Sequence, residues 1–265
     1  MNRFAELTAR LKRKRKKAFV VYLTAGFPDI AATRALLPRL QAAGADCIEL
    51  GMPFSDPVAD GATIQHASQE ALRQGMTVRR FLELVKSVRA RITVPLIMMT
   101  YYNPLLQYGL AAFVAQAREC GLDGIIVPDL PPEESGALLH LLKPAGIAQI
   151  FLVSPLSDAA RIRMIARACA GFIYYVPLTG VTGARAALAA GYAGKIRAIK
   201  AVSPLPVYVG FGVSQPEQVR RLAQAADGVI VGSALLDIVR QTYGSKNFPG
   251  AVERFVTNLN AQTFE

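Results

Sequence analysis

Two carboxylates are the residues of this chain best suited to chemistry. Glu49 stands inside the apolar run CIEL and, by the alternation of a strand, faces away from Ile48 and Leu50. Asp60 closes the proline-containing loop that follows this run. Because burial of an unpaired carboxylate is strongly unfavourable, Glu49 requires either a partner or a function.

Each carboxylate also has a purely structural interpretation. Glu49 could form an ion pair with a core lysine, and Asp60 could cap a helix that begins at residue 62. Only two histidines, His66 and His140, are present, so a histidine-centred metal site or a Ser-His-Asp triad has almost no residues to draw on. No metal site is predicted, and acid–base chemistry falls to the carboxylates.

Eight short apolar segments have the pattern of strands that are buried on both faces of a parallel sheet. Amphipathic segments with charges at helical spacing alternate with them. Eight such units in 265 residues predict an α/β protein with a closed (β/α)8 TIM barrel rather than an open doubly wound sheet. The predicted strands span residues 18–24, 46–50, 95–100, 124–128, 148–153, 171–176, 206–210 and 228–232.

The barrel is predicted to carry two additional helices. A helix over residues 2–14 precedes the first strand and is expected to plug the bottom of the barrel. The second strand is followed by two helices, near 62–73 and 78–90, so one of them is extra. No linker divides the chain, and residues 1–265 are predicted to form a single domain. Glycines between a helix and the next strand are predicted as helix C-caps, namely Gly44, Gly121, Gly146, Gly171 and Gly228.

The active site of such a barrel lies at the C-terminal ends of its strands. Glu49 ends the second predicted strand and Asp60 ends the following loop, so both are expected at that face. The turns after the last three strands are glycine-rich, and a helix is predicted to begin at Ser233. Backbone N–H groups in such turns and at a helix N-terminus bind anions, so these turns predict a phosphate site.

Aromatic residues could complete an apolar pocket at the same face. Taken one at a time, each is better explained by ordinary core packing. The candidates are Tyr22, Tyr101, Tyr102, Tyr174, Tyr175 and Phe211.

The chain is basic, with a formal net charge of +11 and six consecutive cationic residues at 12–17. This run raises a nucleic-acid hypothesis, but no aromatic residue interleaves it, which favours a solvated helix end. The three cysteines, an odd number without CxxC spacing, argue against a disulfide framework. No apolar run is long enough to span a membrane and the charged N-terminus does not resemble a signal peptide, so a cytoplasmic location is expected.

The motifs that carry these residues resemble those of the tryptophan synthase alpha subunit family. ELGMPFSDPVADG at 49–61 is similar to the signature of that family. Five further segments match in order along nearly the whole chain: AFVVYLTAGFP, MMTYYNP, VPDLPPEES, TGVTGAR and VGFGVS.

The resemblance implies retro-aldol cleavage of indole-3-glycerol phosphate to indole and glyceraldehyde 3-phosphate. It implies that Glu49 shuttles the protons and that Asp60 hydrogen-bonds the ring N–H and stabilises its positive charge. It further assigns phosphate binding to Gly183, Gly212, Gly232 and Ser233, the indole pocket to Tyr22, Tyr101, Tyr174 and Phe211, and closure over the substrate to Thr182.

The resemblance also implies a partner. The family works as an alpha2beta2 complex in which the beta subunit uses pyridoxal phosphate to join indole to serine, and the alpha subunit needs no cofactor. Segments 53–58, 103–104 and 128–132 resemble its contact surface. Two other interpretations stay open at this point: a stand-alone lyase that works without the beta subunit, and a non-catalytic barrel that binds anions or nucleic acid through the basic run.

Overall fold

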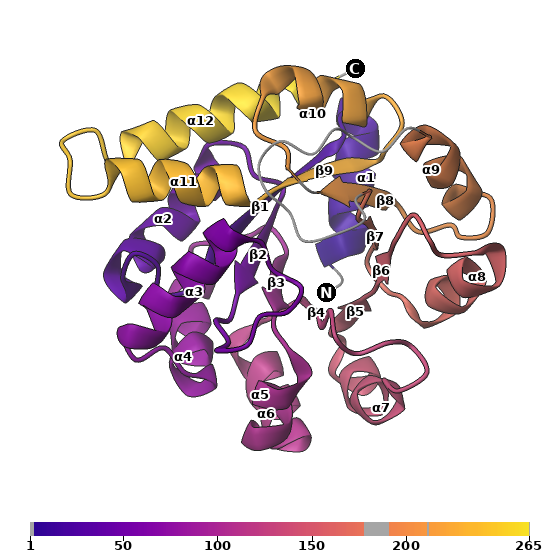
Figure 1. Cartoon of the computed structure of the whole chain (residues 1–265), viewed down its shortest axis with the longest axis horizontal. Helices are drawn as coiled ribbons and strands as arrows, with labels where there is room; N and C mark the ends of the chain where they lie inside the picture. Colours follow the sequence, from indigo (N-terminus) through magenta and orange to yellow (C-terminus); the bar gives the residue numbers. More distant parts are fainter. Residues whose placement is uncertain (1–2, 178–190, 211, 265) are drawn as a thin grey trace.

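The computed structural model describes residues 3–177, 191–210 and 212–264, in which parallel strands form one curved sheet surrounded by helices (Figure 1). The strand order is β5-β4-β3-β2-β1-β9-β8-β7-β6, so the two ends of the sheet are consecutive in the sequence and the barrel is nearly closed. The strands are β1 Ala18–Thr24, β2 Cys47–Gly51, β3 Leu96–Met99, β4 Gly124–Ile126, β5 Ala148–Ile150, β6 Leu152–Val153, β7 Ile173–Tyr175, β8 Val207–Gly210 and β9 Gly228–Val231.

The predicted barrel is confirmed, with one difference in the fifth predicted strand. This strand is divided at Phe151 into β5 and β6. β5 pairs with β4, in the register Gly124↔Ala148, whereas β6 pairs with β7, in the register Leu152↔Tyr174. The interruption at Phe151 separates a half that pairs with β4 from a half that pairs with β7, and a pattern of apolar residues cannot reveal this change of neighbour.

Helices cover the outer face of the barrel, and the extra helix predicted after β2 is present as α3. α5, α9 and α12 were not singled out by the sequence. None of the helices within the described ranges is long and apolar enough to cross a membrane. The helices are α1 Arg3–Lys14, α2 Ile30–Ala42, α3 Ala62–Arg73, α4 Val78–Arg89, α5 Tyr102–Tyr108, α6 Leu110–Cys120, α7 Gly136–Ala145, α8 Ala159–Ala168, α9 Tyr192–Lys200, α10 Pro216–Ala223, α11 Ser233–Thr242 and α12 Gly250–Asn260, followed by a short 3-10 turn at Ala261–Thr263.

α1 plugs the bottom of the barrel, as predicted. Its buried side chains Phe4, Leu7 and Leu11 pack against the inward-facing side chains of the strands, which form a cluster separate from the outer core. Ion pairs hold the helix in place: Arg3 lies 2.7 Å from the carboxylate of Asp123. The plug fills the amino end of the barrel with apolar side chains, and the cavity that contains Glu49 opens at the carboxyl end.

The glycines predicted as helix caps have different roles. Gly121 and Gly146 are left-handed C-caps of α6 and α7, as expected. The prediction for Gly228 is wrong, because this residue begins β9. A Cβ atom at Gly228 would lie 2.6 Å from Cδ1 of Tyr208, so the glycine allows the Tyr208 ring to pack against the strand.

Replacement of Leu7 tests the plug. Leu7→Ala leaves a cavity under the barrel, since the side chain is 2% exposed, and is expected to lower the free energy of unfolding by about 2–4 kcal/mol. Glu6→Ala, on the exposed side of the same helix, is the control. Denaturant unfolding that gives equal stabilities for the two variants would contradict the packing described here.

Candidate active site

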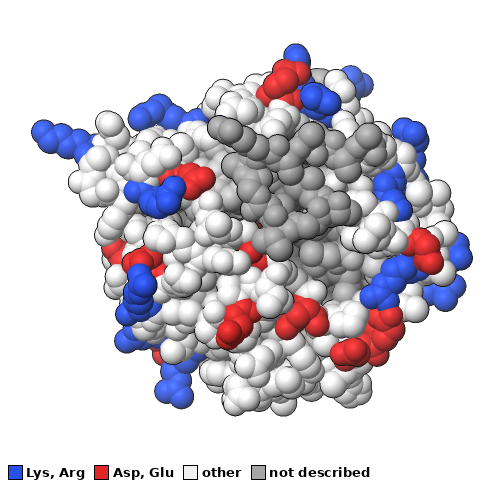
Figure 2. Space-filling view, viewed as in Figure 1, with Lys and Arg blue, Asp and Glu red and all other residues white. Residues whose placement is uncertain are grey.

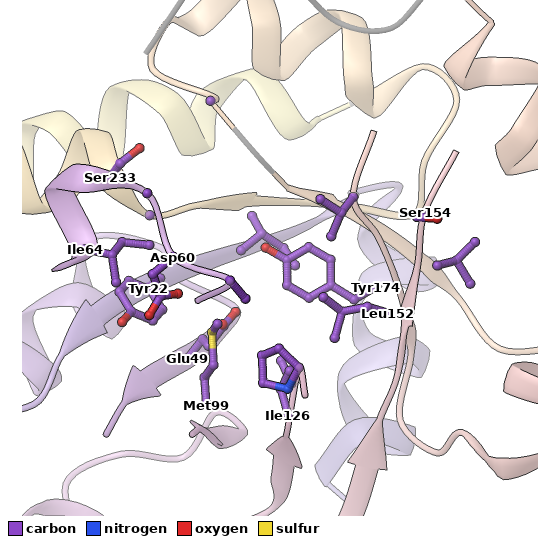
Figure 3. A pocket seen from close by; sticks show the side chains of 18 of the residues that line it. Tyr22, Glu49, Asp60, Ile64, Met99, Ile126, Leu152, Ser154, Tyr174 and Ser233 are labelled. Atoms are coloured by element: carbon purple, nitrogen blue, oxygen red, sulfur yellow. The ribbon is translucent and has the colours of Figure 1, made fainter. Parts of the chain in front are cut away.

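A cavity of about 480 Å³ opens at the carboxyl ends of the strands (Figure 3). Glu49, Asp60 and Tyr22 lie together on one side of it, and Tyr174 and Leu152 lie across from them. The size is within the usual range for a site that encloses a small molecule. The cavity therefore brings together both predicted carboxylates and two of the predicted aromatic residues.

Glu49 projects into the cavity from β2 and is 1% exposed. Its Oε2 atom has no hydrogen-bond partner among the described residues, and no ion pair to a lysine is found among them. Burial, together with the nearby charge of Asp60, raises the pKa of Glu49 from 4.5 to about 8. The core ion pair considered from the sequence is thus not observed within the described ranges.

Asp60 reaches the same cavity from the loop between β2 and α3 and is 6% exposed. Burial raises its pKa from 3.8 to about 6, and a hydrogen bond with the Tyr101 side chain opposes part of this rise. The N-cap of α3 is Gly61, which makes no side-chain capping bond. Asp60 therefore does not serve as the cap of this helix, and its carboxyl group is directed to the cavity.

The two carboxyl groups differ in their affinity for a proton. At neutral pH a group with a pKa of about 8 is mostly protonated, whereas one with a pKa of about 6 is mostly ionised. Neighbouring acids whose environments separate their pKa values are the arrangement by which one site supplies both an acid and an anion. At neutral pH, Glu49 can therefore donate a proton into the cavity while the neighbouring Asp60 carries a negative charge.

Tyr22 and Tyr174 form the aromatic walls, and burial raises the pKa of both hydroxyl groups, which stay neutral. The Tyr22 hydroxyl lies 3.2 Å from Oγ1 of Thr24. A Cβ atom at Gly51 would lie 2.1 Å from the Tyr22 hydroxyl oxygen, so only glycine at this position leaves room for the ring. Tyr101 does not line the cavity, and its hydroxyl supports the loop before Asp60 by accepting a hydrogen bond of 2.9 Å from the Ala59 backbone.

The glycine turns meet the cavity at the N-terminus of α11. Gly212, Gly232 and Ser233 line this end, and Gly232 is the N-cap of the helix. Its carbonyl accepts from the backbone N–H groups of Leu235 and Leu236. The first N–H groups of a helix lack acceptors within the helix and favour a negative charge, so this end of the cavity suits a phosphate.

Some site residues were predicted and others were missed. Thr182, Gly183 and Phe211 lie outside the described residues. Met99, Ile126 and Leu152 line the cavity but look like ordinary core in the sequence. The two-residue alternation along the strands could have identified them as facing inward, because they share the inner face with Glu49. Ile64, Ser154, Ser157 and Arg161 also line the cavity, and no sequence signal singled them out.

A (β/α)8 barrel with buried carboxyl groups and an anion-binding helix end at its open mouth defines an enzyme that performs acid–base chemistry on a phosphorylated substrate. The model of the family described as "Tryptophan synthase alpha chain" matches residues 8–263. The chain belongs to the tryptophan synthase alpha chain family. It is a carbon–carbon lyase of tryptophan biosynthesis that cleaves indole-3-glycerol phosphate.

Individual relatives agree with this assignment. The tryptophan synthase alpha chain of Geobacter sulfurreducens is 48% identical over 238 residues, which are 90% of each chain. That of Chloroflexus aggregans is 46% identical over 252 residues, 95% of this chain and 94% of the relative. A solved structure of the alpha subunit from Legionella pneumophila has a TM-score of 0.91 at 36% identity and covers 99% of this chain and 98% of its own. A structure of Mycobacterium tuberculosis tryptophan synthase also has a TM-score of 0.91 at 36% identity, and the match covers 100% of this chain and 99% of that one.

The buried carboxyl group of Glu49 has a measurable effect on stability. The pKa of Glu49 is higher in the folded chain than the ordinary 4.5, so the folded state binds its proton more tightly than the unfolded state does. The resulting contribution to the free energy of unfolding is complete below about pH 4.5 and is lost as the pH rises through about 8. Glu49→Gln removes this loss, so the variant is expected to become more stable than the wild type at pH 8.5 by more than about 1 kcal/mol.

The measurement is the difference in unfolding free energy between variant and wild type from pH 4 to pH 8.5. Glu6→Gln, which makes the same substitution at an exposed carboxylate on α1, is the matched control. A flat difference for Glu49→Gln would mean that this group is not held in its neutral form by burial.

Proposed function

We propose that Glu49 and Asp60 carry out the cleavage of indole-3-glycerol phosphate in this chain. The single observation that supports this assignment most strongly is that both carboxyl groups are buried at one cavity, with pKa values of about 8 and about 6. One group can then donate a proton while the other carries a negative charge.

In the proposed reaction, protonated Glu49 gives its proton to the indole ring carbon that bears the side chain. The ring nitrogen then carries a positive charge, which the carboxylate of Asp60 stabilises through a hydrogen bond to the ring N–H. The carboxylate of Glu49 accepts the proton of the neighbouring hydroxyl group, and the carbon–carbon bond breaks with its electron pair passing to the ring. Indole and an aldehyde result, and Glu49 is protonated again.

The proposed substrate orientation follows from the two ends of the cavity. Tyr22 and Tyr174 offer apolar walls for indole near Glu49, and Gly212, Gly232 and Ser233 offer backbone donors to the phosphate. Tyr101 contributes indirectly, by holding the loop that carries Asp60. Three further residues of the proposal lie outside the described residues. Gly183 is proposed to bind the phosphate, Thr182 to close over the substrate and Phe211 to contact indole.

Membership in this family implies a beta subunit as partner, and we propose an alpha2beta2 complex to which indole is passed directly. Exposed apolar side chains around the cavity mouth support a docking surface there: Val58 is 76% exposed on the loop after β2, and Leu106 is 49% exposed on α5. Pyridoxal phosphate is assigned to the beta subunit, with no cofactor in this chain. A single domain and a cytoplasmic location remain part of the proposal.

Substitution of the two carboxylates tests their roles. Glu49→Gln and Asp60→Asn, each assayed with the beta subunit present, are expected to lower the rate of indole release by a factor of at least about 100. Glu6→Gln is the control and is expected to retain the wild-type rate. Full activity in either site variant would refute its assigned role, and high activity of the isolated chain that added beta subunit leaves unchanged would favour a stand-alone lyase.

The pH dependence of kcat/KM gives a second test. The proposed working form has Asp60 ionised and Glu49 protonated, so activity is expected to rise as the pH passes about 6 and to fall as it passes about 8. A steady-state profile from pH 5 to pH 9.5, corrected for the stability of the complex, measures both limbs. Activity that continues to rise above pH 9 would show that Glu49 does not act as the acid in the free enzyme.

A further inference from the structure

A second cavity, of about 430 Å³, lies at the amino end of the barrel and is distinctly basic. Five of its thirteen lining residues are cationic and one, Asp227, is acidic. We call this the basic cavity. Its lining residues are Thr8, Leu11, Lys12, Arg15, Lys16, Lys17, Lys200, Ser203, Pro204, Leu205, Pro206, Tyr208 and Asp227.

The basic cavity is separate from the active site. Lys16 and Lys17 precede β1, residues 204–206 precede β8 and Asp227 precedes β9, so the lining belongs to the ends of the strands opposite to Glu49. On the face that carries the loop between β2 and α3, Lys and Arg are scattered toward the edges, and acidic side chains stand nearer the centre (Figure 2). Among the described residues on this face, the cationic side chains are therefore not gathered near the centre.

Two of the five cations in the basic cavity are neutralised by ion pairs, and two others are not. Lys16 pairs with Asp46, and Lys200 lies 2.7 Å from Asp227. Lys12 and Arg15 form no ion pair among the described residues, although both are exposed and line the same cavity. These two side chains are free to bind an anion.

Arg15 also occupies a backbone position that disfavours it. Its φ is +47°, and among the described residues it is the one residue other than glycine with a left-handed backbone. The N–H of Lys16 donates to the carbonyl of Leu11 at 3.1 Å, which makes Arg15 the residue that ends α1 where glycine is normally found. An arginine at a backbone position that favours glycine suggests that its side chain has a function.

Tyr208 supplies a hydroxyl group to the same cavity. The residue as a whole is 2% exposed, but its hydroxyl is not one of the fully buried atoms that lack a partner among the described residues, so it faces the cavity rather than the packed core. Burial, with Cys47, Asp46 and Asp227 nearby, raises the pKa of Tyr208 well above its usual value, so the hydroxyl keeps its proton. A neutral hydroxyl beneath unpaired cations can donate to a negatively charged oxygen.

We infer that the basic cavity binds the polyphosphate group of a small molecule. Arg15 and Lys12 would hold the outer phosphate oxygens, and the Tyr208 hydroxyl would donate to an inner one. A compact ligand fits this cavity better than a nucleic-acid strand does. The volume is small, Pro204 and Leu205 form part of the wall, and the lining residues include no exposed aromatic side chain on which a base could stack. This binding does not depend on the assignment of the catalytic residues.

The test uses the full chain in complex with the beta subunit, with inorganic tripolyphosphate as the probe, in titration calorimetry at low salt. The critical variant is Arg15→Gly, which removes the side chain and suits the left-handed backbone. It is expected to weaken tripolyphosphate binding about tenfold, without lowering the unfolding temperature or the rate of indole release. Arg13→Ala, which removes the same charge from the same run but does not line the cavity, is expected to bind as the wild type does.

Tyr208→Phe adds a readout that bulk charge does not affect, and a severalfold loss of tripolyphosphate affinity is expected. No binding by the wild type would overturn the proposal. Equal weakening by Arg13→Ala and Arg15→Gly would also overturn it, since the anion would then respond to the general field of the basic run. Unchanged binding in Arg15→Gly would place the anion at the active site, and tight retention of duplex DNA that both variants reduce equally would indicate a nucleic-acid surface instead.

Discussion

The exclusion of water from the carboxyl group of Glu49 is the constraint on which the rest of this structure depends. An acid in contact with solvent would be ionised at neutral pH and could not donate a proton. β2 places the group inside the barrel, and the inward-facing Met99 and Ile126 line the cavity with it. The barrel is closed from below by α1, so this environment is secured from the opposite end of the molecule. The same burial that raises the pKa of Glu49 makes its ionised form unfavourable for the fold, and the proposed chemistry uses the protonated form that results.

The two ends of the barrel differ in structure. The amino end is packed by α1 and tied by ion pairs such as Arg3 to Asp123, which favour a rigid base. The carboxyl end carries loops and helix ends that face the cavity. This division explains how a strained residue such as Arg15 and a buried carboxyl group such as Glu49 coexist, since each lies at a separate end and perturbs different contacts.

The parts of the structure that local sequence controls could be predicted, and those set by contacts across the fold could not. Eight apolar runs and the helices between them identify the barrel, and Glu49 stands out because a charge within such a run has few explanations. The division of the fifth strand at Phe151 depends on which neighbours each half meets. Leu152 was missed because an apolar residue facing a cavity resembles one in the core, and Gly228 was misassigned because the Tyr208 ring that requires it is 20 residues earlier in the chain.

The interruption at Phe151 also divides one strand of the barrel wall into two segments that pair with different neighbours. Along most of the circumference, adjacent strands are fixed to each other by a ladder of backbone hydrogen bonds, whereas β5 and β6 are joined end to end by one residue. Leu152 and Ser154, which follow this interruption, line the cavity on the side across from Tyr22. The interruption does not free this wall, because the carbonyl of Phe151 accepts from the backbone N–H of Tyr174 at 3.1 Å and that of Val153 accepts from Val176 at 2.9 Å. The side of the cavity that carries Leu152 is therefore held to β7 by hydrogen bonds that begin at the interrupting residue itself.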